Sequence, residues 1–290
     1  MEMKESKNKN VAAFFDIDGT IYRDSLLIEH FKMLVQYEYI DMMTWEGKVK
    51  EKFSKWENRT GDYDDYLDEL VQTYMEALKN FSKEDMDFIA KRVMKLKGDK
   101  VYRYTRERLK YHKEKKHKVI IISGSPDFLV SKMAERYGVE DYRASIYEVD
   151  ENGIFTGNVI PMWDAKSKQK AITDFCKKYD IDLVCLAGYM KIVGPTLLAA
   201  YEGRIINIHP AYLPEFPGAH GIDDAWEAGV DQSGVTIHWV DSGVDTGKVI
   251  KQVRVPRLAD DTIDSFETRI HENEYKLYPE VLESLGVKKK

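Results

Sequence analysis

The sequence predicts an α/β fold in which a mostly parallel sheet is flanked by helices and the N-terminal half carries a helical cap insertion. Several short, continuous apolar runs are typical of strands buried on both faces, as in parallel sheets. Loops and helical segments separate these runs, and this alternation is typical of parallel α/β units. One long stretch near the N-terminus is helical in period and lacks β-branched runs, which predicts the cap.

The elements of the N-terminal half follow from these patterns in order. A strand is predicted over 11–15, where the run VAAFF ends at an acid. The aromatic-rich stretch 25–108 is predicted to be the helical cap, with a turn at 58–61. A second buried strand over 118–122 is followed by a loop and then by a helix over 127–137.

The remaining elements continue the same pattern. Because no Pro- or Gly-rich linker separates the two halves, we expect them to share one continuous, Rossmann-like sheet. The predicted elements are a hairpin over 143–160, a helix over 166–179, strands over 183–187, 204–208 and 235–240, an edge strand over 248–255 and a helix over 262–285.

Composition excludes several classes of protein. A chain of 290 residues with 43% hydrophobic residues can bury a sizeable core. Its formal net charge of -6 gives no overall attraction to nucleic acid or to an anionic membrane, so small-molecule substrates are expected. Two cysteines are too few for a disulfide framework, and neither an export signal nor an apolar run of about 20 residues is present, which favours a cytoplasmic protein. The sequence gives no oligomeric state.

The first chemically informative segment follows the first predicted strand. Asp16 and Asp18 lie two residues apart, followed by a glycine and a threonine, at the sheet edge where ligands of α/β proteins bind. Such a pair can bind Mg²⁺ and attack phosphorus. The alternative is a pair of acids that merely caps a turn after the strand.

This segment, FFDIDGTIYRDSLL, resembles the first motif of the haloacid dehalogenase superfamily, and the cap resembles that of its phosphoserine phosphatase-like members. VIIISGSP resembles the second motif and AKSKQKAI the third. The resemblance implies a phosphatase with Mg²⁺ bound by both acids. It implies these roles: Asp16 as nucleophile, Asp18 as general acid and base, Ser123 as phosphate ligand and Lys168, or nearby Lys166, as the neutralising cation.

One motif of that superfamily is missing. After KKYDIDL the superfamily expects a strand that ends in an acidic Gly-Asp motif, whereas this chain has VCLAGYMKIVG, without an acid. The cation would then have too few anionic ligands. Phosphatase activity is therefore expected to be weak or absent.

A second group of polar residues lies in the C-terminal half. Asn207 and His209 share one face of a predicted strand, because residues two apart in a strand point the same way. Asp245 lies in a glycine-containing loop that can hold an acid beside another strand end. An amide, an imidazole and a carboxylate together suit acyl transfer to an amine, although each could also be a packing or turn residue.

Three segments here, NIHPAYLPEFPGAHG, SGVTIHWVDSGVDTG and EYKLYPEVL, closely resemble the phosphoribosylglycinamide formyltransferases of purine biosynthesis, over roughly the last 110 residues. The resemblance implies that Asn207, His209 and Asp245 form the catalytic trio. The trio would transfer a formyl group from 10-formyltetrahydrofolate to the amine of glycinamide ribonucleotide.

The same resemblance implies the binding residues. The folate pocket is expected at Met190, Lys191, Ile192 and Val193, and Glu274 is expected to contact the nucleotide. The family's N-terminal, glycine-rich phosphate loop is missing, which could impair the transfer.

The change of resemblance between 173 and 183 predicts a hybrid chain, with a haloacid dehalogenase-like segment over 11–180 and a formyltransferase-like segment over 181–290. Formyl transfer ranks first, because its catalytic trio is locally complete. The alternatives are a Mg²⁺-dependent phosphomonoester hydrolase that forms an aspartyl-phosphate, and an inactive hybrid that binds folate or phosphate.

Overall fold

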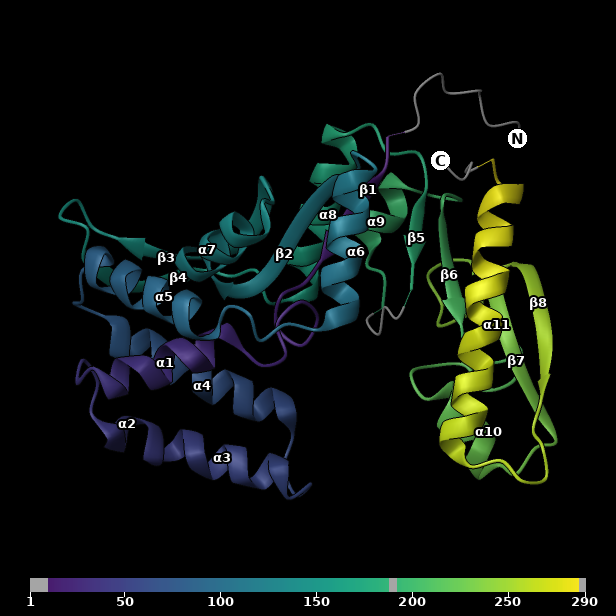
Figure 1. Ribbon diagram of the computed structural model, residues 1–290, viewed down its shortest axis with the longest axis horizontal. Helices are drawn as coiled ribbons and strands as arrows, with labels where there is room; N and C mark the ends of the chain where they lie inside the picture. Colours follow the sequence, from purple (N-terminus) through teal and green to yellow (C-terminus); the bar gives the residue numbers. More distant parts are fainter. Residues whose placement is uncertain (1–9, 188–191, 287–290) are drawn as a thin grey trace. The chain divides into compact units, whose positions relative to one another are not determined.

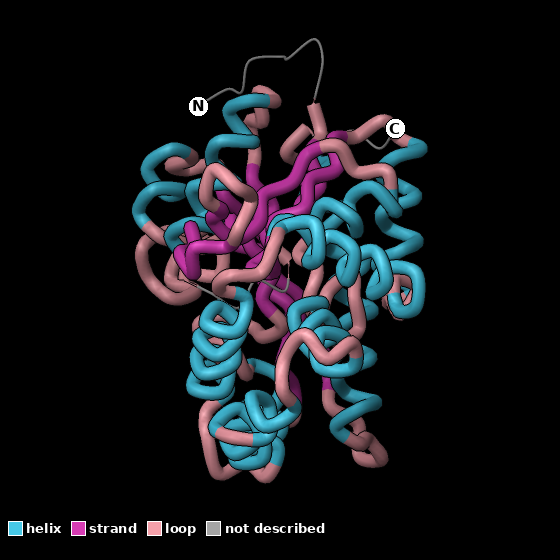
Figure 2. Tube along the Cα trace, turned by 90° about the vertical axis from the view of Figure 1, so that its left-hand side faces the viewer, coloured by secondary structure: helices cyan, strands magenta, loops and turns pink. Residues whose placement is uncertain are grey.

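The computed structural model describes residues 10–187 and 192–286 (Figure 1). The described chain divides into two compact units, each considered by itself. Val11–Ala171 form the N-terminal unit, and the described residues from Ile172 onward belong to the C-terminal unit. Figure 2 shows the helices and strands along the chain in separate colours.

The N-terminal unit is built on a four-stranded sheet with the order β1-β2-β3-β4. β1 pairs with β2 and β2 with β3 in parallel, whereas β4 returns antiparallel beside β3. This sheet is therefore mostly parallel. Its strands are β1 (Ala12–Phe15), β2 (Lys118–Pro126), β3 (Asp141–Val149) and β4 (Phe155–Ile160).

β2 is longer than the predicted strand. We expected a loop after residue 122, but the strand continues to Pro126, which pairs with Ser145 of β3 after an irregularity in the register. The hydroxyl of Ser145 also donates a hydrogen bond to the Gly124 carbonyl over 2.7 Å. These contacts with the neighbouring strand keep the SGSP segment extended, which its turn-like composition did not indicate.

The predicted helical insertion between the first two strands is confirmed. α1 packs on α5 and α3 on α4, and their apolar faces share one core that includes Phe31, Leu70 and Tyr74. The turn at residues 58–61 follows the end of α3, as expected. The helices are α1 (Leu26–Gln36), α2 (Met42–Glu46), α3 (Lys48–Glu57), α4 (Tyr63–Leu78), α5 (Lys83–Lys97) and α6 (Arg103–Glu114).

Helix α7 (Asp127–Tyr137) connects β2 to β3 and covers the residues predicted for it. It ends at Gly138, whose φ of +58° is the left-handed conformation that glycine adopts without strain. The local sequence thus determines where this crossover helix stops.

The C-terminal unit contains a second four-stranded sheet with the order β5-β6-β7-β8. β5 and β6 are parallel, whereas β7 is antiparallel to both of its neighbours, so that β8 lies at the predicted edge. Helix α8 (Ala165–Lys178) runs across the boundary of the units. The other elements are β5 (Val184–Leu186), α9 (Pro195–Ala200), β6 (Ile205–His209), α10 (Gly221–Glu227), β7 (Gln232–Trp239), β8 (Val249–Pro256) and α11 (Ile263–Ser284).

The long helix α11 covers β7 and β8. Its buried residues Phe266, Ile270, Leu277 and Val281 lie on one stripe and pack with apolar side chains of the sheet such as Val235. Spacings of three and four residues place these side chains on the same face of a helix. This packing makes the sheet and helix one core.

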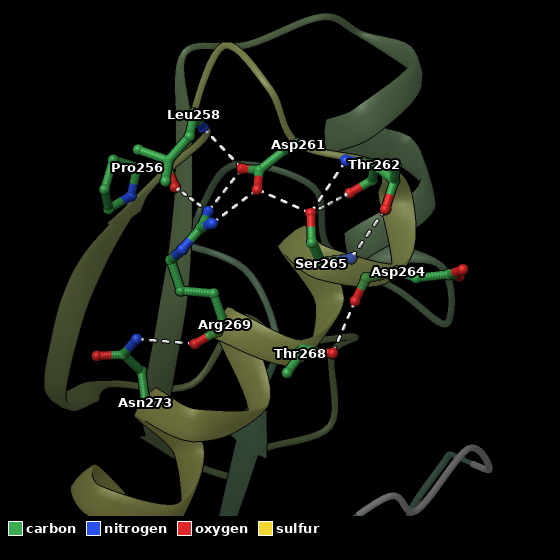
Figure 3. Close-up of polar contacts among 9 residues, drawn as sticks. All are labelled: Pro256, Leu258, Asp261, Thr262, Asp264, Ser265, Thr268, Arg269 and Asn273. Atoms are coloured by element: carbon green, nitrogen blue, oxygen red, sulfur yellow. Dashed lines mark hydrogen bonds and ion pairs between the residues drawn. The ribbon is translucent and has the colours of Figure 1, made fainter.

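The start of α11 is fixed by a network of polar groups (Figure 3). Thr262 is the N-cap, and its side chain and that of Ser265 each accept a hydrogen bond from the other's backbone N–H, which forms a capping box. Arg269 binds Asp261 through two hydrogen bonds of 2.6 Å. Unpaired N–H groups of the first helical turn are thereby satisfied.

The α/β class of the chain, with helices flanking the sheets, is confirmed. Among the described strands, parallel and antiparallel pairs are equally frequent, because β7 and β8 form a hairpin that apolar runs alone do not distinguish from parallel strands. One sheet continuing through both halves stays a prediction. In the part of the chain that the structure describes, no helix has the length and apolar character needed to cross a membrane.

Candidate functional site

The first predicted cluster lies at the C-terminal end of β1. Asp16 directly follows this strand, and Lys168 of α8 reaches its Oδ2 atom with Nζ over 2.5 Å. Lys166, the alternative cation, has an exposed side chain. The structure therefore brings together two predicted residues that are 152 positions apart in the chain.

Asp18 is held more tightly than Asp16. Its Oδ1 accepts a hydrogen bond from the backbone N–H of Leu26 over 2.7 Å, and its Oδ2 accepts one from the Ser125 hydroxyl over 2.6 Å. Burial raises the pKa of Asp18 to about 6, and the Asp16 charge adds to this, against the hydrogen bonds and the Lys168 charge. Near neutral pH this carboxyl can therefore give or take a proton.

Ser125 was missed by the sequence reasoning, which selected Ser123. Ser123 is fully buried, and its hydroxyl oxygen accepts a hydrogen bond from the backbone N–H of Ser125 over 3.2 Å. Ser125 is the serine that contacts an acid of the cluster. Both serines belong to the SGSP segment, so only their orientation along β2 separates the two roles.

The donors around Asp16 and Asp18 do not fit the predicted Mg²⁺. All four carboxylate oxygens accept hydrogen bonds: Ile17 N–H and Lys168 bind Asp16, and Leu26 N–H and Ser125 bind Asp18. Magnesium needs several oxygen ligands that are free of competing donors. Among the described residues, no three His, Cys, Asp or Glu side chains are grouped so that they could hold a metal ion.

The second predicted cluster lies on β6 and the loop between β7 and β8. Asn207 and His209 point the same way from β6, and in the register of the sheet Asn207 lies opposite His238 of β7. Asp245, with a φ of +54°, lies in the loop and accepts a hydrogen bond from Gly218 N–H over 2.8 Å. The predicted trio thus comes from two separate parts of this unit.

Two histidines face the same carboxylate. His209 Nδ1 lies 3.5 Å from Asp245 Oδ2, and His238 Nε2 lies 3.5 Å from Asp245 Oδ1. Both imidazoles are almost fully buried. His238 was not among the predicted residues. The signal that could have found it is its alternation with Thr236 on a strand that pairs with β6.

The ring nitrogens that point away from Asp245 determine the proton positions. His209 Nε2 is 2.8 Å from the Phe216 carbonyl, and His238 Nδ1 is 2.9 Å from the Trp239 carbonyl. Because a carbonyl oxygen only accepts, these nitrogens carry hydrogen. A neutral ring would then turn a lone pair toward the carboxylate, so each contact with Asp245 is favourable when that ring is protonated. The cluster is therefore built to hold and pass on protons.

Asn207 completes this arrangement with a polar group that needs a partner. Its Oδ1 atom is buried, and among the described residues no hydrogen bond to it is present. A buried polar atom without a partner costs about 1–3 kcal/mol. The amide is thus suited to a ligand that supplies the missing contact.

The loop after His209 is held by a buried threonine. Thr236 Oγ1 donates to the Ala211 carbonyl over 2.7 Å and accepts from Leu213 N–H over 3.0 Å. A Cβ atom at Gly221 would lie only 3.1 Å from His209 Nε2, so a larger residue there would press on the ring. These contacts fix the position of His209.

The residues predicted to bind folate are only partly described. Met190 and Lys191 lie outside the described residues. Ile192 is 67% exposed, whereas Val193 is buried. The folate pocket stays a prediction.

Glu274, predicted to contact the nucleotide, lies on α11. Its side chain is 16% exposed, and its Oε2 atom is 2.7 Å from His271 Nδ1. His271 was not among the predicted residues. Contact between Glu274 and a nucleotide stays a prediction.

Comparison with known proteins gives the family. The family described as formyl transferase matches residues 91–282, more than half of the chain. The phosphoribosylglycinamide formyltransferase of Bacillus subtilis (strain 168) is 45% identical over 117 residues, which are 40% of this chain and 60% of that protein. The trifunctional purine biosynthetic protein adenosine-3 of Drosophila melanogaster is 36% identical over 167 residues, 58% of this chain and 11% of that protein.

A solved structure of phosphoribosylglycinamide formyltransferase from Streptococcus pneumoniae TIGR4 is 56% identical and covers 62% of this chain and 93% of that chain, with a TM-score of 0.45. The chain spans about 60% of the length of the Bacillus subtilis relative. The family match begins at residue 91, well before the predicted change of resemblance between 173 and 183. On the extent of this match, the chain belongs to the formyl transferase family.

Proposed function

We propose that this protein transfers a formyl group from 10-formyltetrahydrofolate to the amine of glycinamide ribonucleotide, a step of purine biosynthesis. The observation that carries the proposal is the cluster of His209, His238 and Asp245, in which two imidazoles face one carboxylate at 3.5 Å beside Asn207. Such a cluster suits a reaction that removes a proton from an amine and returns one to a leaving nitrogen. The relatives named above carry the same activity in their names.

The chemistry follows from the residue types. As the amine attacks, a C–N bond forms and negative charge develops on the formyl oxygen, which the Asn207 amide and the charge of a protonated His209 stabilise. Asp245, through water, takes up the proton that the amine loses. The bond from the formyl carbon to the folate nitrogen then breaks, and the histidine–carboxylate cluster returns a proton to that nitrogen.

His209 acts mainly through its charge in the arrangement seen. When protonated, its two N–H groups are directed at the Phe216 carbonyl and at Asp245. The hydrogen bond to the developing oxyanion therefore comes from Asn207. The transfer depends on small-molecule substrates, and we infer a cytoplasmic location from this role.

The test is formyl transfer by the purified protein and by Asp245→Asn. We expect the substitution to lower kcat/KM about 10²–10⁴-fold, because the amide cannot accept the proton. Asp223→Asn, the same change at an exposed position of α10, is the matched control and keeps wild-type activity. No transfer by folded wild-type protein, or equal activity of Asp245→Asn, would contradict the proposal. Binding of folate without transfer would favour the inactive hybrid.

We infer phosphomonoester hydrolysis as the second candidate function. It is favoured by Lys168 at 2.5 Å from Asp16 and by the raised pKa of Asp18. Asp16 would attack phosphorus while the bond to the leaving oxygen breaks, and Asp18 would protonate that oxygen. No step is routed through Mg²⁺, because the oxygens that would bind it already accept hydrogen bonds.

This second candidate is tested by phosphate release from p-nitrophenyl phosphate, with and without added Mg²⁺. We expect at most slow release, abolished in Asp16→Asn. Lys166→Met is the control, since its exposed side chain is not part of the cluster. Release that is equal in wild type and Asp16→Asn would exclude an aspartyl-phosphate.

A further inference from the structure

Glu274 occupies an unusual position on α11. The buried residues of this helix include Ile270 and Leu277, and position 274 lies four residues after the first and three before the second. It therefore belongs to the stripe that the helix turns toward the sheet. An acid there, with a side chain only 16% exposed, loses hydration that a surface acid would keep.

His271 compensates part of this loss. Its Nδ1 atom is 2.7 Å from Glu274 Oε2, and its Nε2 atom is 3.4 Å from Glu267 Oε1. Because carboxylates only accept, both ring nitrogens donate in this arrangement, and the ring is an imidazolium. Burial lowers the pKa of His271, but the hydrogen bonds and charges of Glu274 and Glu267 outweigh it, and the pKa is raised.

The hydrogen bond fixes Glu274 from one side only. Among the described residues, Glu274 has no other hydrogen-bond or ion-pair partner than His271, so Oε1 can accept a hydrogen bond from a ligand. The imidazole ring is itself supported by Tyr275, which stacks on it at 6.4 Å between ring centres. Both groups that hold the carboxylate lie on its own helix, so its rotamer is set before a ligand arrives.

We propose that His271 is a positioning residue for formyl transfer: it holds Glu274 so that Oε1 accepts a hydrogen bond from a hydroxyl or amine of the ribonucleotide substrate. The inference rests on the proposed function. It predicts an effect on nucleotide binding and none on the chemistry of the formyl group, because His271 lies on α11 and not in the cluster around Asp245.

The experiment compares His271→Leu, which removes the donor, with His271→Gln, which keeps one. For His271→Leu we expect the KM for glycinamide ribonucleotide to rise about tenfold, the usual effect of one hydrogen bond. Its kcat and its KM for 10-formyltetrahydrofolate stay within about twofold of wild type. His271→Gln restores most of the nucleotide KM. Lys276→Leu, at an exposed position of the same helix, is the matched control.

A double-mutant cycle with Glu274→Gln separates positioning from a general loss of structure. If His271 acts through Glu274, the variant His271→Leu/Glu274→Gln has the same nucleotide KM as Glu274→Gln alone. Additive effects, an unchanged KM in His271→Leu, or a His271→Gln variant as impaired as His271→Leu would each overturn the inference while transfer by wild type stands. Absence of transfer by wild type would overturn the proposed function and this inference with it.

Discussion

At the scale of single residues, His30 shows how burial sets the charge of a side chain. It lies in the core of the helical insertion, where the Tyr74 hydroxyl donates to its Nδ1 over 2.8 Å and its Nε2 donates to the Met86 carbonyl over 3.3 Å. Burial lowers the pKa of His30 to about 4, although the hydrogen bond to Met86 raises it. The ring is therefore neutral in the folded protein at pH 7.

This shift predicts a pH-dependent loss of stability. Between pH 6.5 and 4 the unfolded chain binds a proton at His30 that the folded chain does not, so the free energy of unfolding falls as pH falls. The contribution of His30 over this window is about 3 kcal/mol. Asp18 acts in the opposite direction, because its raised pKa makes the folded chain bind a proton first.

The measurement is urea unfolding of wild type and His30→Gln at pH 7 and pH 4.5. We expect the difference between the two pH values to become smaller in His30→Gln. The comparison uses each protein's own pH difference, so that loss of the Tyr74 contact at both pH values cancels. An unchanged difference would show that His30 already titrates at an ordinary pKa.

At the scale of elements, the capping network decides where α11 begins. Asp261 accepts hydrogen bonds from Arg269, from Leu258 N–H and from the Ser265 hydroxyl. These groups tie the loop before the helix to its second turn (Figure 3). The hydrogen bond with Arg269 and the others hold the pKa of Asp261 well below its usual range.

Asp261→Asn is expected to lower the thermal unfolding midpoint of the C-terminal unit at pH 7. The amide cannot accept two hydrogen bonds from the Arg269 guanidinium. A group with a depressed pKa stabilises the folded state above its unfolded pKa and loses this effect at lower pH. The midpoints of wild type and Asp261→Asn should therefore converge toward pH 2.

Asp264→Asn, at an exposed position of the same helical turn, is the control for the change in charge. A drop as large as that of Asp261→Asn would assign the effect to helix electrostatics and not to the network. The drop at pH 7 is read by circular dichroism.

At the scale of the whole molecule, the two groups of polar residues belong to different units. Asp16, Asp18 and Lys168 lie in Val11–Ala171, whereas His209 and Asp245 lie in the other unit. Each unit has its own sheet and its own hydrophobic core. The chemistry proposed for each group can therefore be examined separately.

Hydrogen exchange with and without 10-formyltetrahydrofolate tests this separation. We expect slower exchange in the loop that follows His209 and in the loop that contains Asp245, because a bound ligand suppresses local opening. Peptides from residues 11–171 should exchange at the same rate in both samples. Protection of the SGSP segment would contradict the assignment and would place a ligand at β2.

The sequence by itself determined the elements and the ends of strands where polar residues gather. Helix α7 and the strands β1 and β6 lie where the local patterns predicted them, because apolar runs and helical periods report burial of the chain's own faces. The sequence also pointed to Asp16, His209 and Asp245 by their motifs. The direction of β7 was not determined, because an apolar run is the same for parallel and antiparallel neighbours.

Only the tertiary structure decided which of several similar side chains meet. Lys168 and not Lys166 reaches Asp16, since residues two apart on a helix point to nearly opposite sides. His238 faces Asp245 from β7, whose pairing with β6 is not written in either strand. His271 holds Glu274 because both lie on one side of a helix whose burial depends on the sheet beneath it. Such contacts depend on distances across the fold, which local sequence does not contain.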